Sequence, residues 1–325
     1  LFSKITGTSP ELANFGVDLG GTNIKAAVVD DEKGIIEQVT TPTQANLGKE
    51  HLLDRISETV KDLVKKNEII GIGLGLPGMV SKDQTTVRNP PNLPGWTEVN
   101  ASEEISKRTN IPCKIENDAN IAALGSLHFG VGKKFDSFIM VTLGTGVGGG
   151  IIMDRNLYKG TGGMAGELGH VIIDYHGPLS NSVTRGTVEA YLGQRFLSRF
   201  ATDLITQNPS NPLYKKFSND FDKLEPVDLT AAAKEGNELA IEILAKSGYR
   251  LGYAIINYVH MMDIRKIVVA GGVSRAGDFL FEPAKEIVRK HMMEPFKEGF
   301  ELVYEDLGND SALLGAAGLA FDSFS

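Results

Sequence analysis

The stretch FGVDLGGTNIKAAVVD, residues 15–30, decides the fold of this chain. Apolar residues alternate on both sides of the paired glycines at 20 and 21, a pattern typical of two strands joined by a tight hairpin turn. We expect these glycines to supply the positive φ angles that such a turn requires. A second stretch, FIMVTLGTGVGGGIIM at residues 138–153, repeats the order of strand, glycine turn and strand. The repeat suggests a duplicated protein with two lobes.

The segments around these hairpins predict strands that alternate with helices. Residues 69–76 predict a third strand, and residues 266–270 predict another. Helices are predicted at residues 52–63, 119–127 and 188–262, the last with a break at 208–212. Strands alternating with helices indicate an α/β protein, and the hairpins predict mixed rather than purely parallel sheets.

Length and composition limit the possible classes of protein. A chain of 325 residues suggests two domains, and 42% hydrophobic with 23% charged residues is an ordinary globular balance, which argues against disorder and collagen. No run reaches the roughly 18 apolar residues of a membrane helix, and residues 1–4 do not begin a signal peptide. The net charge of −8, without a long Lys or Arg run, predicts no nucleic-acid partner.

Two residue types that occur once add further expectations. The only cysteine, Cys113, forbids an internal disulfide and fits a reducing cytoplasm. In its apolar surroundings we expect a small buried side chain rather than a reactive thiol. The only tryptophan, Trp96, belongs to the stretch NPPNLPGW, residues 89–96, which predicts a rigid surface loop.

The first hairpin turn has the residues of a phosphate-binding loop. In GGTN, residues 20–23, the glycines let phosphate oxygens approach backbone N–H groups, and the two polar side chains add donors. Asp18 would hold Mg²⁺ directly or through water. A plain hairpin is the alternative, and the further glycine turns at residues 144–146 and 271–272 weaken it. The sequence contains no P-loop motif, and no Rossmann glycine pattern follows the first strand.

These stretches resemble the motifs of a known fold. Residues 18–22 resemble the first phosphate motif of the actin/hexokinase/Hsp70 ATPase fold, residues 144–150 its second phosphate motif, and residues 268–274 its adenosine motif. Within that fold, ENDAN at residues 116–120 and ELGH at residues 167–170 are similar to the ROK family of repressors, open reading frames and sugar kinases. The resemblance spans most of the chain.

The resemblance implies an α/β protein with two lobes of the actin-like (ribonuclease H-like) type, mixed sheets and a central cleft. We expect a smaller N-terminal lobe of residues 1–120 plus 311–325 and a larger C-terminal lobe of residues 121–310. The resemblance also implies a homodimer, formed by helices that follow Tyr191.

Asp118 is the candidate catalytic base. A sugar kinase must accept the proton of the hydroxyl that attacks the phosphoryl group. A carboxylate at a helix N-terminus is held ionised by the helix dipole and nearby N–H donors. The residues alone leave a helix cap as the alternative for Asp118, whereas the resemblance implies the base acting on the sugar O6.

The remaining site residues follow from the same resemblance. Carboxylates and imidazole suit a polyol because each exchanges hydrogen bonds with adjacent hydroxyls. The sugar-binding set is Gly78, Asn92, Asn117, Asp118, Glu167, His170 and Glu189. The nucleotide-binding set is Asp18, Gly20, Gly21, Thr22, Asn23, Lys25, Gly144, Thr145, Gly146, Gly148, Gly271 and Gly272, with Asp18 also placing Mg²⁺ through the phosphates.

The resemblance implies a cytoplasmic enzyme that uses ATP and Mg²⁺ to phosphorylate a hexose at O6. Glucose is favoured because residues 89–96 look like the corresponding loop of bacterial glucokinases. Kinases of N-acetylmannosamine, N-acetylglucosamine, mannose or fructose remain alternatives, as does polyphosphate as the donor, because sequence does not define pocket shape.

Two alternatives belong to other classes of protein. A sugar-responsive repressor would need a helix-turn-helix domain of about 60 residues before the first phosphate motif, and 17 residues precede Asp18. A pure ATPase or chaperone of the same fold would lack the set Glu167, His170 and Glu189. We therefore expect an enzyme.

One stretch departs from the family pattern. Most members follow the histidine with three cysteines of a zinc site, whereas Ser180, Ser182 and Thr187 stand there in this chain. Neutral hydroxyls are poor Zn²⁺ ligands compared with thiolates, so we expect no structural zinc. The alternative is a rearranged site that recruits Asp174 and His176.

Overall fold

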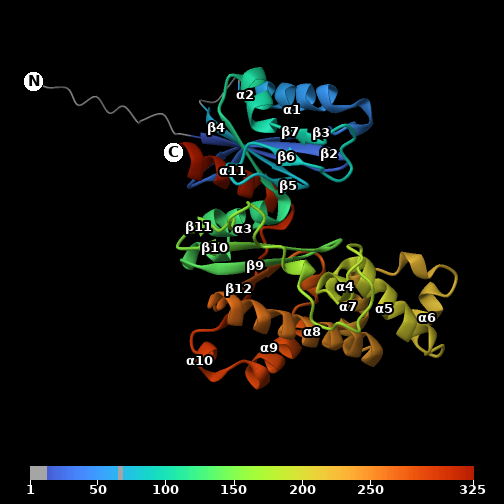
Figure 1. The fold of residues 1–325 in the computed structure, drawn as a ribbon. Helices are drawn as coiled ribbons and strands as arrows, with labels where there is room; N and C mark the ends of the chain where they lie inside the picture. The colour runs from blue at the N-terminus through green and yellow to red at the C-terminus, as the bar shows by residue number, and fades with distance from the viewer. Residues whose placement is uncertain (1–12, 65–68) are drawn as a thin grey trace, which may run out of the picture. The chain divides into compact units, whose positions relative to one another are not determined.

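The computed structural model describes residues 13–64 and 69–325, which divide into two compact units (Figure 1). The first unit contains the chain up to Lys133, Lys159–Ala165 and Leu307–Ser325, and the second contains Lys134–Tyr158 and Gly166–Asp306. The expected lobe boundary at residue 120 therefore differs from the division found here, because residues 121–133 belong to the first unit. The prediction that residues 1–4 do not begin a signal peptide concerns residues outside these described ranges.

The first unit is built on a mixed five-stranded sheet. Its strands are β1 (Ala13–Leu19), β2 (Asn23–Asp30), β3 (Gly34–Pro42), β4 (Ile69–Leu76) and β8 (Cys113–Asn117), in the order β3-β2-β1-β4-β8. The β1–β2 and β2–β3 pairs are antiparallel, while β1–β4 and β4–β8 are parallel. The predicted hairpin and the mixed sheet are confirmed.

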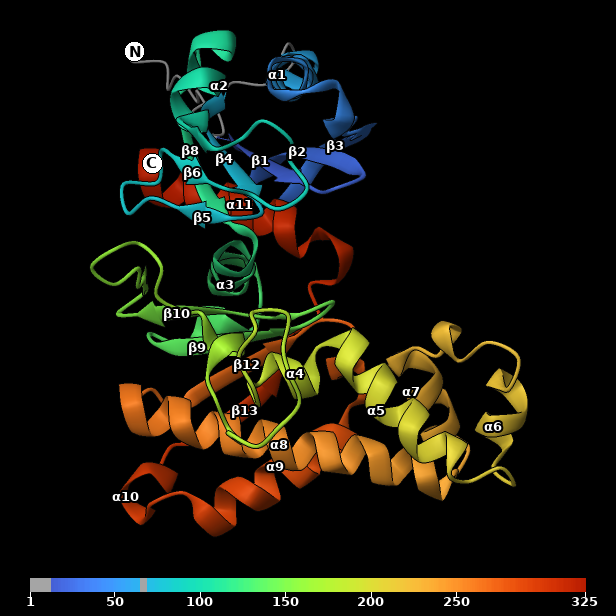
Figure 2. The same ribbon diagram turned by 45° about the vertical axis from the view of Figure 1, so that its right-hand side comes forward.

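Helices cover both faces of this sheet. α1 (Lys49–Val64) and α2 (Ala101–Thr109) lie on one side, and α11 (Ser311–Phe324) lies on the other (Figure 2). The apolar stripe predicted within residues 52–63 is buried in the core between α1 and the sheet. α3 (Asp118–Phe129) packs against α11, which explains why it belongs to the first unit.

Glycines allow α11 and α3 to pack this closely. A Cβ atom at Gly73 of β4 would lie 1.8 Å from the carbonyl oxygen of Ala316 in α11, and one at Gly315 would lie 1.9 Å from that of Ile121 in α3. A small sheet of β5 (Met79–Val80), β6 (Val87–Arg88) and β7 (Glu98–Val99) completes the unit.

The second unit repeats the sheet pattern of the first. Its strands are β9 (Phe138–Leu143), β10 (Val147–Met153), β11 (Asn156–Leu157), β12 (Lys266–Ala270) and β13 (Glu301–Tyr304), in the order β11-β10-β9-β12-β13. β9 and β10 form an antiparallel hairpin. β12 pairs with β9 in parallel, and β13 pairs with β12 in parallel. Each sheet therefore joins an antiparallel hairpin to parallel strands, which agrees with the predicted duplication.

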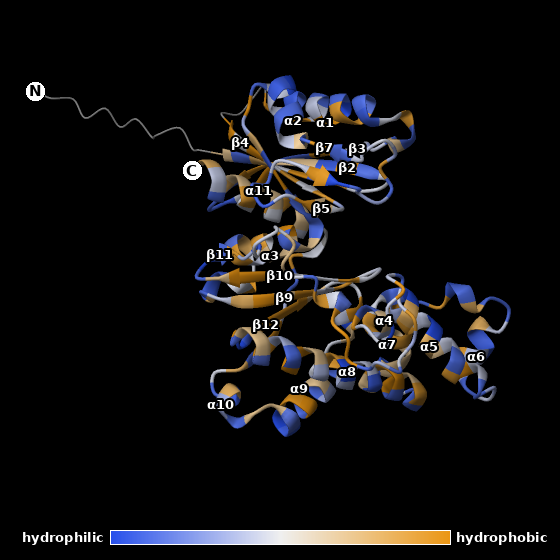
Figure 3. Cartoon of the chain, viewed as in Figure 1, coloured by the Kyte–Doolittle hydropathy of each residue, from blue (hydrophilic) through white to orange (hydrophobic). Residues whose placement is uncertain are grey.

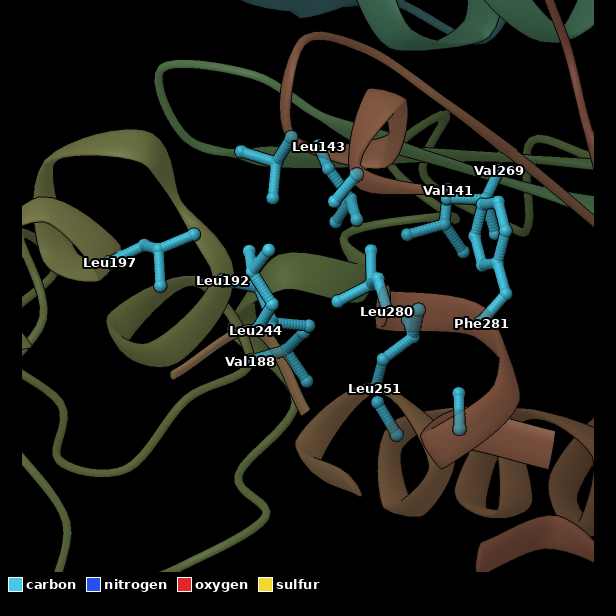
Figure 4. Packing of buried hydrophobic residues seen from close by; sticks show 14 of the residues in the cluster. Val141, Leu143, Val188, Leu192, Leu197, Leu244, Leu251, Val269, Leu280 and Phe281 are labelled. Carbon is cyan, nitrogen blue, oxygen red and sulfur yellow. The ribbon is translucent and has the colours of Figure 1, made fainter. Parts of the chain in front are cut away.

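The helices of the second unit confirm the helical region predicted after residue 188. They are α4 (Glu189–Leu192), α5 (Gln194–Thr206), α6 (Pro212–Phe217), α7 (Pro226–Lys234), α8 (Glu238–Met262), α9 (Asp278–His291) and α10 (Glu294–Lys297). Apolar residues colour much of β10 and β12 (Figure 3). Side chains of α8 and α9, among them Leu251 and Leu280, pack in the same buried cluster as Val141 and Val269 of the sheet (Figure 4). Each Å² of apolar surface that is buried in this core stabilises the fold by about 25 cal/mol.

Two expectations about loops are wrong. Neither Gly20 nor Gly21 has a positive φ. At Gly20 the requirement is space, because a Cβ atom there would lie 2.9 Å from the carbonyl oxygen of Asn23. Trp96 is only 3% exposed, so the indole does not sit on the surface but packs in the core of the first unit, while Asn92 of the same loop is exposed. Across residues 13–64 and 69–325, no helix is long and apolar enough to cross a membrane.

Candidate active site

Three predicted site residues lie at one edge of the sheet in the first unit. β1, β4 and β8 are parallel, and their register sets Asp18 beside Gly75 and Gly75 beside Glu116. Asn117 ends β8, and Asp118 begins α3. The carboxyl ends of neighbouring parallel strands are where ligands bind in α/β sheets. The topology therefore brings Asp18 and the first turn of α3 to one place.

The two residues at the start of α3 have different tasks. Asn117 is the N-cap, and its side-chain oxygen accepts a hydrogen bond from the backbone N–H of Asn120 at 2.8 Å. Asp118 accepts one from the N–H of Ala119 at 2.9 Å through Oδ1. Asn117 thus provides the cap, which weakens the view that Asp118 is present only to cap the helix.

Both aspartates have a raised pKa because their carboxyl groups are partly desolvated, although Asp118 is an exposed residue. Loss of solvation raises the pKa of Asp118 above its ordinary value of 3.8, and the N–H donor of Ala119 opposes this by a smaller amount. The N–H groups at the helix N-terminus lower the pKa of Asp118, as expected, but desolvation has the larger effect. Burial also raises the pKa of Asp18, Lys25 across the hairpin lowers it, and the nearby charge of Asp118 raises it further. A raised pKa suits a general base, which works best when its pKa approaches the operating pH.

The first glycine turn is exposed at residues 21–23. The N–H of Gly20 donates to the carbonyl oxygen of Asn23 at 3.0 Å, while Gly21, Thr22 and Asn23 are exposed. Thr43, which sequence reasoning missed, anchors the turn from below: its hydroxyl donates to the carbonyl oxygen of Gly20 at 2.7 Å, and its N–H donates to that of Thr22 at 2.8 Å. Only the closeness of Thr43 to this turn in the folded chain reveals the contact, because no motif around residue 43 indicates it.

Gly78 and the loop of residues 89–96 are in direct contact. Gly78 has a φ of +112°, and a Cβ atom there would lie 2.8 Å from the Cα of Pro90. Both features require glycine at this position. Asn92, which is exposed with a φ of +63°, lies farther along the same loop. The two predicted sugar-binding residues thus belong to neighbouring segments of the first unit.

In the second unit, Glu189 is bound to the second glycine turn. Its Oε2 accepts a hydrogen bond from the N–H of Val147 at 3.2 Å, and a Cβ atom at Gly146 would lie 2.3 Å from the same oxygen. The N–H of Gln194 donates to the carbonyl oxygen of Gly144 at 2.9 Å. The predicted phosphate motif and the predicted sugar ligand Glu189 therefore form one cluster, in which Gly146 leaves room for the carboxylate.

Glu167 precedes a short 3-10 helix, η3 (Leu168–His170), and His170 is its last residue; η3 packs on β10. A Cβ atom at Gly169 would lie 2.0 Å from the carbonyl oxygen of Val147, and the buried hydroxyl of Tyr258 donates to the carbonyl oxygen of Leu168 at 2.8 Å. The His170 Nε2 and Glu167 Oε2 atoms are 3.6 Å apart, and both side chains are exposed. These contacts fix the backbone of the turn, while its carboxylate and imidazole are exposed to solvent.

The predicted adenosine motif forms a sharp turn at the end of β12. Gly271 has a φ of +97°, and a Cβ atom there would lie 2.3 Å from the carbonyl oxygen of Leu143. The hydroxyl of Ser274 donates to the carbonyl oxygen of Gly271 at 2.6 Å, while Gly272 has open space around it. Because β12 lies beside β9, this turn and the Gly144–Gly146 turn are at the same edge of the sheet; Gly148 lies in β10, opposite Thr142.

Hydrogen bonds shape the loop that contains Ser180, Ser182 and Thr187, the positions where the resemblance implied cysteines in the family. The hydroxyls of Ser180 and Ser182 are 2.8 Å apart, and the N–H of Ser182 also donates to Ser180 Oγ. Thr187 is buried and accepts from the N–H of Ala190 at 3.2 Å. The carboxylate of Asp174 is engaged by the hydroxyl of Tyr191 at 2.6 Å. Within the described parts of the chain, no group of three or more His, Cys, Asp or Glu side chains could hold a metal ion.

The chain matches one protein family over almost its whole length. The sequence profile of the ROK family matches residues 14–323. The chain belongs to the ROK family. Its fold is the actin-like ATPase fold of the ROK sugar kinases, as predicted. This ROK protein is 35% identical over 310 residues to a glucokinase of Thermotoga maritima, covering 95% of this chain and 98% of the relative.

Two further relatives show the range of the family. A crystal structure of a ROK family glucokinase from Streptomyces griseus in complex with glucose and AMPPNP superposes with a TM-score of 0.79 at 30% identity, covering 96% of this chain and 100% of that one. A xylose repressor of Bacillus subtilis is 26% identical over 328 residues, which covers 100% of this chain and 79% of the repressor. The ROK protein therefore resembles both enzymes and regulators, and its site chemistry has to distinguish them.

Proposed function

We propose that this ROK protein is an ATP-dependent hexose kinase that phosphorylates the sugar at O6, with glucose as the preferred substrate. The observation that carries the proposal is the position of Asp118: it is exposed at the first turn of α3, at the carboxyl end of the parallel strands, and its charge is close enough to Asp18 to raise the pKa of that residue. The glucokinase of Thermotoga maritima and the glucose complex of the Streptomyces griseus enzyme support the choice of substrate.

Asp118 acts as general base in the proposed reaction. Its carboxylate accepts the proton of the sugar O6 hydroxyl while O6 bonds to the γ-phosphorus of ATP. The bond between that phosphorus and the bridging oxygen breaks, and ADP leaves with the electron pair. In this proposal Asn117, Gly78 and Asn92 of the first unit bind the sugar, and Glu167, His170 and Glu189 of the second unit supply further hydrogen bonds to its hydroxyls.

The glycine turns hold the nucleotide in this proposal. Residues 21–23 are exposed, and backbone N–H groups and polar side chains in such a turn suit phosphate oxygens. The partly desolvated carboxyl of Asp18 fits Mg²⁺, since a cation would offset the burial that now raises its pKa. When bound, Mg²⁺ supplies charge neutralisation of the phosphates, and the remaining coordination positions would come from phosphate and water. The Gly271–Gly272 turn receives the adenosine.

The substitution Asp118→Asn tests the base. We expect kcat to fall about 10²–10⁴-fold, because general-base assistance is typically of that size, while glucose binding measured by calorimetry stays close to wild type. The matched control is Asp278→Asn, because Asp278 is also the first residue of a helix, α9, outside the site. A variant of Asp118 with wild-type turnover would remove this residue from the base role.

A substrate panel separates the remaining alternatives. Steady-state rates with glucose, mannose, fructose and the two N-acetylhexosamines, each against ATP and polyphosphate, rank the acceptors and donors by kcat/KM. We expect glucose with ATP to give the highest value. Absence of sugar phosphate formation with every acceptor and both donors would instead favour the repressor function. The proposed homodimer is tested by light scattering.

A further inference from the structure

We propose that Lys159 and Glu116 are positioning residues that hold the first turn of α3, and with it Asp118, against the segment that leads to Glu167. The inference rests on the proposed function in that Asp118 is the base. It concerns two buried charged residues outside the predicted site: Glu116 opens the ENDAN stretch but has no predicted role, and Lys159 belongs to none of the motifs.

Glu116 gathers several donors on one buried carboxylate. The residue is 0% exposed, and Lys159, which is 9% exposed, forms an ion pair with its Oε2. The side-chain amide of Gln84 donates to the same oxygen at 3.1 Å. Oε1 accepts from the N–H of Asn117 at 2.9 Å and from the side-chain amide of Asn120 at 3.1 Å. Both oxygens of the carboxylate are therefore engaged.

Two of these donors lie on either side of Asp118 in the sequence. Asn117 precedes it and Asn120 follows two residues later, so the Glu116 carboxylate holds one backbone N–H and one side chain of the turn that carries the base. Asp118 is thus fixed through its neighbours, and its own carboxylate takes no part in this network. Such an arrangement orients a reactive group without occupying it.

Lys159 comes from a segment that changes units. Residues 159–165 belong to the first unit, while the chain before and after them belongs to the second. The segment is held tightly: Gly163 has a φ of +87°, and a Cβ atom there would lie 2.7 Å from the backbone nitrogen of Lys82. Glu167 follows two residues after the segment ends. The ion pair therefore ties the turn of the base to the start of the chain that carries the predicted sugar ligands.

The energetics favour a positioning role over a stabilising one. Burying both ions costs solvation that their attraction only partly returns, and replacing such pairs with apolar residues is often neutral or stabilising. Removal of one partner alone is costly because it leaves a buried charge. A neutral double replacement therefore separates stability from positioning.

The experiment compares Lys159→Met, the double variant Lys159→Met/Glu116→Gln and the control Lys266→Met. The control removes another Lys–Glu pair, that of Lys266 with Glu301, at the start of β12. We expect the double variant to recover the melting temperature lost in Lys159→Met but to keep kcat lowered about 10–100-fold, because small misplacements of a catalytic group have effects of that size. ATP affinity should remain unchanged, and the control should match wild type.

Hydrogen exchange supplies a readout that does not depend on activity. In Lys159→Met and in the double variant, protection of the backbone N–H groups in residues 117–121 should fall, while the control keeps it. Unchanged protection would overturn the proposal whether or not the protein is a kinase. Recovery of kcat together with stability in the double variant would show that the pair is only structural. If the wild-type protein lacks kinase activity, the proposed function fails, and the exchange data still decide whether the pair holds this turn.

Discussion

At the residue scale, the environment of Asp118 shows how burial outweighs local donors. The helix N-terminus and the Ala119 N–H favour the carboxylate, yet loss of solvation raises the pKa. The folded protein therefore binds the Asp118 proton more tightly than the unfolded chain does. This shift means that ionised Asp118 lowers the stability of the folded state, by an amount that the solvent exposure of the residue keeps small.

This coupling predicts a pH-dependent gain in stability for Asp118→Asn. Because the pKa is raised in the folded state, ionisation of Asp118 lowers the free energy of unfolding of the wild type as pH rises from 3.8 through the folded pKa. Above the folded pKa this loss of stability stays constant. The variant has no such penalty. We expect its melting temperature to exceed that of wild type at pH 7 and the difference to vanish below pH 3.8. Equal melting temperatures at pH 7 would contradict the raised pKa.

Asp18 carries a separate prediction about the nucleotide. In the proposed site Asp18 serves Mg²⁺ and the phosphates, so Asp18→Ala should lower kcat and weaken Mg·ATP binding. Glucose binding, measured by calorimetric titration without nucleotide, should remain nearly unchanged. An equal loss of sugar affinity would point to a general structural defect instead.

At the scale of elements, glycines decide how closely helices approach the sheet. Gly16 and Gly73, on neighbouring strands, both face backbone carbonyl oxygens of α11 at distances that leave no space for a Cβ atom. A protein interior is close-packed, so such a contact is relieved only by moving the backbone. The same principle places Glu189 against Gly146 in the second unit.

We therefore expect Gly73→Ala to lower stability by about 3 kcal/mol, the upper part of the range typical of overpacking. The added methyl group would lie 1.8 Å from the carbonyl oxygen of Ala316. Gly272→Ala is the control, since that glycine has open space and a φ of −62°. Urea denaturation of both variants measures the effect, and similar midpoints for the two would show that α11 can shift without cost.

At the scale of the whole molecule, the prediction concerns zinc. Ser180, Ser182 and Thr187 replace the thiolates that the family pattern places after the histidine, and hydrogen bonds of these hydroxyls shape the loop. We expect well under one zinc per chain after dialysis, and no effect of a chelator on glucose phosphorylation once Mg²⁺ is restored. Stoichiometric zinc whose removal abolishes activity would contradict this and favour a site recruiting Asp174 and His176.

The sequence by itself determined the two hairpins, the mixed α/β class and the motifs that identify the family. Paired glycines between alternating apolar residues are local signals, and local signals survive in a single sequence. The N-cap position of the Asn117–Asp118 pair and the burial of Cys113 were also predictable, because each depends on immediate neighbours.

Tertiary structure alone decided the rest. The burial of Trp96, the assignment of α3 to the first unit and the direction of the Asp118 pKa depend on what packs against each residue. The network of Glu116, Gln84 and Lys159 joins residues up to 75 positions apart, and the hydrogen bonds from Thr43 to the first glycine turn span about 20. No local pattern encodes such contacts, because desolvation and buried hydrogen bonds exist only when distant segments of the chain close around the same space.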